Sequence, residues 1–168
     1  MRFSEARVVI IRNFLRYCKK SEEKIPPPSH VKYYNDFRII VESPVGTQRF
    51  WTDHSTGEKG ATTMLYDYGF FHGSRGADKE EVDVYLGPEE KAPMAYVVRQ
   101  LKPDTGAFDE VKVFLGFTRE QDAKEAYLKH YTNEKFFGGI TKYPVETLRK
   151  LLKDSVYDPT IIKNSLGK

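Results

Sequence analysis

The middle of the chain alternates apolar and polar residues with the two-residue period of β-strands. Turn-forming residues, such as the run from Lys102 to Gly106, separate these segments and favour a meander of five or more strands. The first two segments flank Pro44-Val-Gly46 and are expected to form a hairpin. The segments with strand composition are 37–43, 47–52, a stretch beginning near Val82, 93–101 and 108–117.

Helical patterns appear after the strands. Thr118 precedes a run with acidic residues in its first turn, which predicts a helix capped by this hydroxyl and ending near His130. Pro144 suits the first turn of a second helix. Strands first and helices later, without regular alternation, indicate an α+β fold with an antiparallel, closed or partly closed sheet.

The N-terminal segment differs from the rest. Residues 4–20 predict an amphipathic helix with Ser4 as cap, which either packs on its own domain or serves as a docking or self-association element. Three consecutive prolines before His30 indicate a linker. We therefore expect a helix and linker over 1–30, a domain over 31–154 and a tail without pattern over 155–168.

Composition narrows the class of protein. The 168 residues suit one domain with extensions, and the net charge of +3 is too small to favour nucleic-acid binding. Cys18 is the single cysteine, and no apolar run has the length of a membrane span. Arg12 and Arg16 interrupt the apolar residues near the start, which argues against a signal peptide. We expect a soluble, cytoplasmic protein.

An acidic segment carries the clearest chemical signal. Asp78, Glu80, Glu81 and Asp83 place four carboxylates within six residues, and Val82 and Val84 then begin an alternating strand from which Asp83 points the other way. Converging carboxylates suit a hard cation, Mg²⁺ or alternatively Mn²⁺. The simpler interpretation is a solvated hairpin loop.

Two motifs resemble a known family. Tyr68-Gly-Phe70, followed ten residues after the tyrosine by Asp78-Lys-Glu-Glu-Val-Asp83, resembles the signature of soluble family I inorganic pyrophosphatases. The preceding Glu42-Ser-Pro-Val-Gly46, with Arg49, is most similar to the pyrophosphatase-like domain of tailed phages and mobile elements. The resemblance covers about residues 36–152 and implies a small five-stranded barrel of the oligonucleotide-binding kind.

The resemblance also implies roles for individual side chains. Glu80 stands where the family activates the attacking water, together with Asp83. Glu110 is an alternative to Asp109 as a ligand, because Lys112 lies one residue farther along than in the family. The implied metal ligands are Glu42, Asp78, Asp83, Asp104 and Asp109. The implied substrate-binding residues are Arg49, Tyr68, Lys112, Tyr131 and Lys135, and Arg75 is a further candidate to stabilise the leaving phosphate.

The sequence departs from the family pattern at several positions. Lys79 and Glu81 stand in place of a glycine and a proline, and Glu80 replaces an aspartate. Trp51 lies near the position where the soluble enzymes of the family carry another acidic residue. The histidines, among them His72 and His130, lack the spacing of a zinc site.

These observations predict a Mg²⁺-dependent hydrolase that cleaves pyrophosphate to phosphate, encoded by a phage or mobile element and acting in the host cytoplasm. One alternative is a non-catalytic module of a phage particle or complex, tethered or oligomerised through residues 4–20. A second alternative is a hydrolase of a nucleotide-linked pyrophosphate. Neither a membrane nor a nucleic acid is expected as a partner.

Overall fold

The computed structural model describes residues 30–53 and 56–168. The helix predicted over 4–20 and the three prolines of the linker lie outside these residues. In the part of the chain that the structure describes, no helix combines the length and apolar character needed to span a bilayer.

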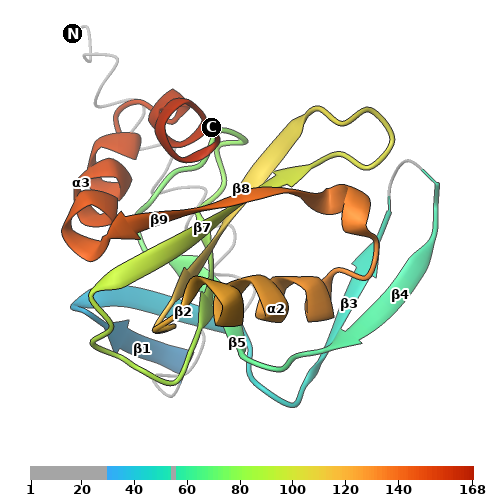
Figure 1. Cartoon of the computed structure of the whole chain (residues 1–168), viewed down its shortest axis with the longest axis horizontal. Coiled ribbons are helices and arrows are strands. Elements are labelled where there is room, and N and C mark those ends of the chain that lie inside the picture. The colour runs from blue at the N-terminus through green and yellow to red at the C-terminus, as the bar shows by residue number, and fades with distance from the viewer. Residues whose placement is uncertain (1–29, 54–55) are drawn as a thin grey trace, which may run out of the picture. The chain divides into compact units, whose positions relative to one another are not determined.

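Seven strands form the main sheet, in the order β1-β2-β5-β6-β8-β7-β9 (Figure 1). Two further strands, β3 and β4, form a separate pair that we call the arm. The strands are β1 (Val31–Tyr34), β2 (Phe37–Ser43), β3 (Gln48–Thr52), β4 (Lys59–Thr63), β5 (Asp67–Phe71), β6 (Asp83–Leu86), β7 (Met94–Leu101), β8 (Phe108–Leu115) and β9 (Phe137–Pro144). The helical elements are α2 (Glu120–His130), α3 (Val145–Ser155), the single turn η2 (Glu134–Phe136) and the π-helical η3 (Ile162–Leu166).

The α+β class is confirmed, but the prediction of a closed five-stranded barrel is wrong. The main sheet is open, because β1 pairs only with β2 and β9 only with β7 among the described strands. The sheet is also mixed, since β6 and β8 run parallel. Helical elements pack on both faces of this open sheet, α2 on one and α3 with η3 on the other.

The hairpin predicted around Pro44-Val-Gly46 is also wrong in its pairing. Both strands exist, but β2 pairs with β1 and β5, whereas β3 pairs with β4. The reason is burial: Phe37, Ile39 and Val41 point from β2 into the core, whereas no residue of β3 is buried. A strand that buries one face fully gains more from the centre of the sheet than from an exposed hairpin.

Each face of the main sheet has its own hydrophobic cluster. On one face Val84, Val97 and Val113 pack with Leu148 of α3 and with the C-terminal Ile162. The segment predicted as a tail therefore places apolar side chains in the core. The other face is aromatic and is covered by α2; its buried members include Tyr68, Tyr85, Phe114 and Tyr127.

The two helices follow the predicted positions closely. α2 begins one residue later than expected: Arg119 occupies the cap position without a side-chain cap, and its guanidinium pairs with Asp122 instead of Thr118 capping the helix. Pro144 is the residue that precedes α3, as its fixed backbone angle favours.

Gly69 allows β2 and β5 to approach closely. A β-carbon at this position would lie 1.9 Å from the carbonyl oxygen of Ile40. The glycine of the Tyr-Gly-Phe motif is thus required by strand pairing, which holds the neighbouring Tyr68 in place.

We predict that Gly69→Ala lowers the free energy of unfolding by about 3 kcal/mol or more, because the added methyl group forces two backbones apart. Gly73→Ala is the control. Its β-carbon meets nothing within 4 Å, and only its positive φ of 79° opposes the change, so it should cost about 1–2 kcal/mol. Urea denaturation of both variants measures the difference; equal costs would contradict the close approach.

His130, the last residue of α2, links this helix to the segment between β4 and β5. Its Nε2 accepts a hydrogen bond from the Leu65 amide at 3.0 Å, and its Nδ1 lies 2.6 Å from the carbonyl oxygen of Ala126. The neutral imidazole, with its proton on Nδ1, satisfies both contacts. Burial lowers the pKa of His130 below its ordinary value of 6.5.

We predict that His130 makes stability fall as the pH drops below about 6.5. The unfolded chain takes up a proton at the ordinary pKa, and the folded chain does so only at lower pH, so acidification favours unfolding in this window. In thermal melts of His130→Gln, the melting temperature should fall less steeply than in the wild type as the pH drops below about 6.5. A slope identical to that of the wild type would exclude this contribution.

Candidate active site

Strand alternation sets the charged residues of the site on the face of the main sheet that α2 covers. Asp83 pairs directly with Lys112 in the parallel register of β6 and β8. Val82 and Val84 enter the opposite core, as the sequence predicted. On β8, Glu110 and Lys112 share a face with the buried Phe114. The polar cluster therefore continues the aromatic cluster toward the N-terminal ends of β6 and β8.

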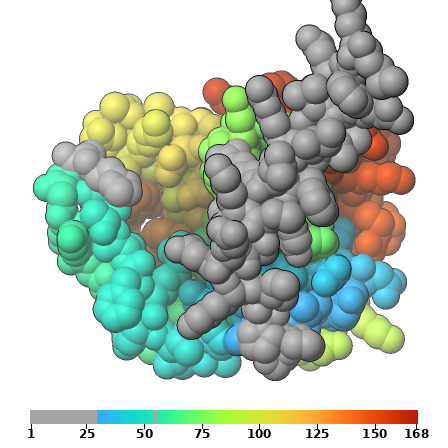
Figure 2. All heavy atoms as spheres, turned by 180° about the vertical axis from the view of Figure 1, so that it is seen from behind, coloured from blue at the N-terminus to red at the C-terminus, as the bar shows by residue number. Residues whose placement is uncertain are grey.

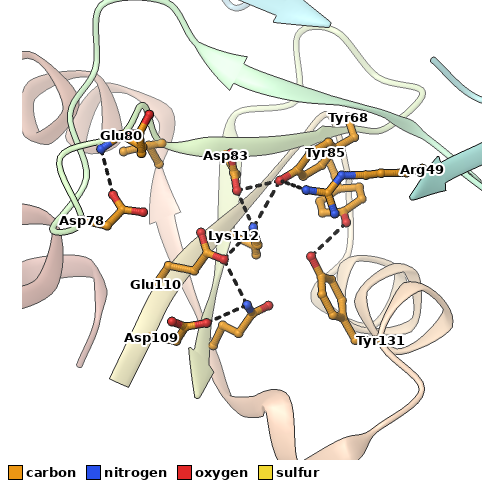
Figure 3. Close-up of polar contacts among 12 residues, drawn as sticks. Arg49, Tyr68, Asp78, Glu80, Asp83, Tyr85, Asp109, Glu110, Lys112 and Tyr131 are labelled. Carbon is orange, nitrogen blue, oxygen red and sulfur yellow. Dashed lines mark hydrogen bonds and ion pairs between the residues drawn. The ribbon is translucent and has the colours of Figure 1, made fainter. Parts of the chain in front are cut away.

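Lys112 is the centre of the cluster (Figure 3). Its side chain is 3% exposed, and its ammonium forms ion pairs with Asp83 and, at 2.9 Å, with Glu110. It also donates to the hydroxyl of Tyr68 at 3.2 Å. A buried ammonium needs such partners, because desolvation of an unpaired charge costs several kcal/mol.

The ionisation of Lys112 and Glu110 reflects this burial. Burial alone lowers the pKa of an ammonium, but the tyrosines and carboxylates around Lys112 outweigh it and raise its pKa well above the ordinary value. Burial raises the pKa of Glu110, while Lys112 acts in the opposite direction. Lys112 is therefore a permanent positive charge at neutral pH.

Arg49 brings a second cation to the cluster from the arm. Its guanidinium lies over the Tyr68 ring, 4.4 Å from the ring centroid, and its Nη2 is 3.3 Å from the Tyr68 hydroxyl. The same hydroxyl donates to Asp83 at 2.6 Å. Burial raises the pKa of Tyr68 far above its ordinary value, so this residue stays neutral.

Other tyrosines and a glutamine complete the cluster. The hydroxyl of Tyr85 lies 3.3 Å from that of Tyr131, and burial raises the pKa of Tyr131 to about 12. Gln100 was not predicted; its amide donates to Asp109 at 3.2 Å and to Glu110 at 3.1 Å. Tyr127 in turn donates to the Gln100 carbonyl oxygen at 3.0 Å. A polar residue on the apolar face of β7 was the available signal for Gln100.

A small pocket beside the cluster, about 10 Å³ in volume, has five acidic residues among those that line it. This is room for about one water molecule. The acidic residues of its lining are Asp78, Glu81, Asp83, Asp109 and Glu110. The acidic loop and the first half of β8 therefore lie beside each other at this pocket.

Carboxylate oxygens of this kind fit a hard cation such as Mg²⁺. Among the residues that the structure describes, however, no three acidic, histidine or cysteine side chains stand close enough to hold a metal ion as they lie. Lys112 balances Asp83 and Glu110 in this arrangement. The donor set therefore fits the cation, and its side chains must turn toward a common point to bind one.

The remaining predicted residues lie outside the lining of this pocket, which does not include Glu42, Arg75, Asp104 or Lys135. Asp104 is in the exposed turn between β7 and β8, and Lys135 is exposed in η2. Glu80 is also absent from the lining, although its neighbour Glu81 is present. The backbone amide of Glu80 donates a hydrogen bond to the Asp78 carboxylate at 3.0 Å, and this bond closes a turn in the acidic loop.

Comparison with known proteins gives one extensive match. Residues 28–153, most of the chain, match the sequence model of a family described as Inorganic Pyrophosphatase. None of the curated proteins matches the sequence.

Solved structures give slight similarities. An inorganic pyrophosphatase from Neisseria gonorrhoeae is 16% identical with a TM-score of 0.44, covering 71% of this chain and 90% of that one. One from Coxiella burnetii is 14% identical, with a TM-score of 0.42 and coverage of 71% and 92%. One from Helicobacter pylori is 15% identical, with a TM-score of 0.41 and coverage of 77% and 97%.

We predict that Lys112→Met lowers the free energy of unfolding by about 3 kcal/mol, because it leaves two partly buried carboxylates without their counter-charge. Lys150→Met is the matched control. Its ammonium is exposed and pairs with Asp154 at 2.7 Å, and such surface pairs contribute about 1 kcal/mol or less.

Adding Glu110→Gln to Lys112→Met should restore part of the loss, since one uncompensated charge disappears. Chemical denaturation of the single and double variants measures this coupling. A Lys112 variant as stable as the Lys150 control would show that the ion pairs contribute nothing to the fold.

Proposed function

As a member of the inorganic pyrophosphatase family, the chain is a phosphoanhydride hydrolase, and we propose that it cleaves pyrophosphate to two phosphates beside Asp83 and Lys112. The observation that carries this proposal is the meeting of two cations, Arg49 and Lys112, at the Tyr68 hydroxyl, where Lys112 also pairs with Asp83 and Glu110. Cations suit the phosphate oxygens of a substrate, and the carboxylates suit the metal ions that such a substrate carries.

Arg49 and Lys112 are the proposed phosphate-binding groups. Both contact the Tyr68 hydroxyl, from the arm and from β8 respectively. A phosphate that replaces part of this network gains two charge-assisted hydrogen bonds and one neutral donor. Tyr131, adjacent through Tyr85, adds a second neutral hydroxyl.

Asp78, Asp83, Asp109 and Glu110 are the proposed ligands of Mg²⁺, with Mn²⁺ as a substitute. When bound, the ion acidifies water and neutralises charge on the phosphate oxygens. Withdrawal of Lys112 toward the substrate frees Asp83 and Glu110 for this role, so the protein exchanges one positive partner of these carboxylates for another.

The carboxylates of the acidic loop are the proposed bases. Water attacks one phosphorus, the bridging P–O bond breaks, and the second phosphate leaves with the bridging oxygen. Glu80 and Asp83 were expected from the family pattern to accept the water's proton. The pocket lining adds Glu81 as an alternative to Glu80.

Further assignments remain part of the proposal. Glu42 and Asp104 as ligands, and Lys135 as a phosphate contact, rest on the family pattern, and so does a phage or mobile-element origin. Arg75 as a phosphate contact, a cytoplasmic location and self-association or docking through residues 4–20 rest on the sequence itself. The division into a helix and linker over 1–30, a domain over 31–154 and a tail over 155–168 also stays a prediction.

A non-catalytic module is the second candidate. The specific observation that favours it is Lys112, which already balances two of the carboxylates that would hold metal. This candidate predicts a folded protein that neither binds Mg²⁺ nor releases phosphate.

We expect the purified protein to release phosphate from pyrophosphate in the presence of Mg²⁺ and to lose this activity in EDTA. The physical reason is that a pocket of carboxylates repels an anionic substrate unless cations reverse the local field. A colorimetric phosphate assay measures both states. Absence of turnover with Mg²⁺ and with Mn²⁺ would favour the non-catalytic module.

We predict that Asp83→Asn reduces this rate by about a hundredfold or more, since the amide keeps the size of the side chain but loses the charge that holds a cation. It should also melt at a lower temperature in EDTA, because Lys112 loses one of its two carboxylate partners. Asp154→Asn, at a partly exposed carboxylate of α3 that pairs with Lys150, is the matched control. Unchanged turnover in the Asp83 variant would remove this residue from the site.

A further inference from the structure

The arm presents two side chains on the face directed at the site. In the antiparallel register of β3 and β4, Arg49 lies opposite Thr62, and Trp51 lies opposite Gly60. Residues two apart on a strand share a face, so Trp51 stands beside Arg49, which contacts Tyr68. In Figure 2 the arm and the turn between β7 and β8 flank a hollow at the edge of the domain.

The indole of Trp51 lies flat on the arm. A β-carbon on Gly60 would come within 2.3 Å of the Trp51 ring, so the ring covers the bare backbone at this glycine. The indole nitrogen donates to the Thr62 hydroxyl at 3.2 Å, which fixes its orientation. Trp51 is nevertheless 39% exposed. One face of the ring is therefore held against the arm and the other is open to a ligand.

The position of this ring suggests what it contacts. Two residues of a strand span about 6.7 Å, so the open indole face lies roughly one sugar unit beyond a phosphate held by Arg49. Inorganic pyrophosphate has no group that reaches it. A purine or pyrimidine base linked through ribose to that phosphate does, and bases stack on such indole faces.

We propose that Trp51 is a specificity-determining platform that stacks the base of a nucleoside diphosphate, with Arg49 on the phosphate next to the ribose. The inference rests on the proposed function and names a substrate class for the same site. Such a substrate is a pyrophosphate that carries a nucleoside at one end.

The reaction is the same hydrolysis. Water attacks the terminal phosphorus, and the P–O bond of the anhydride breaks. The nucleoside monophosphate leaves with the bridging oxygen, and one proton is released. A nucleoside diphosphate and water thus give a nucleoside monophosphate and phosphate, without another reactant.

Tryptophan fluorescence tests the contact directly, because Trp51 is the only tryptophan of the chain. A stacked base quenches an indole. In full-length protein with Ca²⁺ in place of Mg²⁺ to slow turnover, adenosine diphosphate should quench the emission with saturation, and pyrophosphate should quench it at least several-fold less. Free tryptophan amide corrects for absorption by the base. Equal responses to the two ligands, or none, would overturn the proposal.

Kinetics provide the second test. Trp51→Ala should lower the ratio of kcat/KM for adenosine diphosphate to kcat/KM for pyrophosphate by about tenfold or more, as expected from loss of base stacking. Trp51→Phe should recover most of this ratio. Phe50→Ala is the control, because Phe50 is 80% exposed on the opposite face of β3 and should leave the ratio unchanged.

The two proposals fail separately. If the wild type cleaves pyrophosphate but Trp51→Ala leaves the ratio unchanged, the platform is refuted and the proposed function stands. A ring that only covers Gly60 gives this result, with a lower melting temperature for Trp51→Ala. If adenosine diphosphate is cleaved in a Trp51-dependent way and pyrophosphate is not, the platform stands and inorganic pyrophosphate is excluded as the substrate.

Discussion

The buried ammonium of Lys112 is the interaction on which the site depends. It lies between Asp83 and Glu110, which come from two parallel strands of the main sheet. Without it, two partly buried carboxylates would face each other uncompensated, and one of them would have to take up a proton or bind another cation. The parallel pairing of β6 and β8 therefore has a chemical consequence, because it sets a lysine opposite the last aspartate of the acidic loop.

The surrounding residues extend the same electrostatic balance. Tyr68 connects Asp83 with both Lys112 and Arg49, and its raised pKa keeps it a neutral donor between charges. The arm supplies Arg49 from outside the main sheet. In this arrangement the two cations and the carboxylates stabilise each other in the absence of ligands, and the proposed function assigns the cations to phosphate and the carboxylates to metal.

Local patterns in the sequence predicted local structure well. The alternation of Val82, Asp83 and Val84 gave the correct orientation of the carboxylate, and Pro144 marked the start of α3. Pairing between distant segments was beyond these patterns. The exposed β3 pairs with β4 outside the main sheet. In the main sheet, an irregularity between Gln100 and Leu101 shifts the register of β7 on β8. Spacing along the chain matched Asp109 to a metal-binding aspartate of the family. In the structure Glu110 lies on the same face of β8 as Lys112 and forms the ion pair with it.

The most direct test of the account is to locate the metal. Crystals soaked in Mn²⁺ with a non-hydrolysable pyrophosphate analogue, measured at the manganese absorption edge, would show each bound ion as an anomalous peak. The account predicts a peak in the pocket lined by Asp83 and Glu110, with Lys112 turned toward the analogue. Ordered analogue with Lys112 still between the two carboxylates and no manganese in that pocket would contradict it.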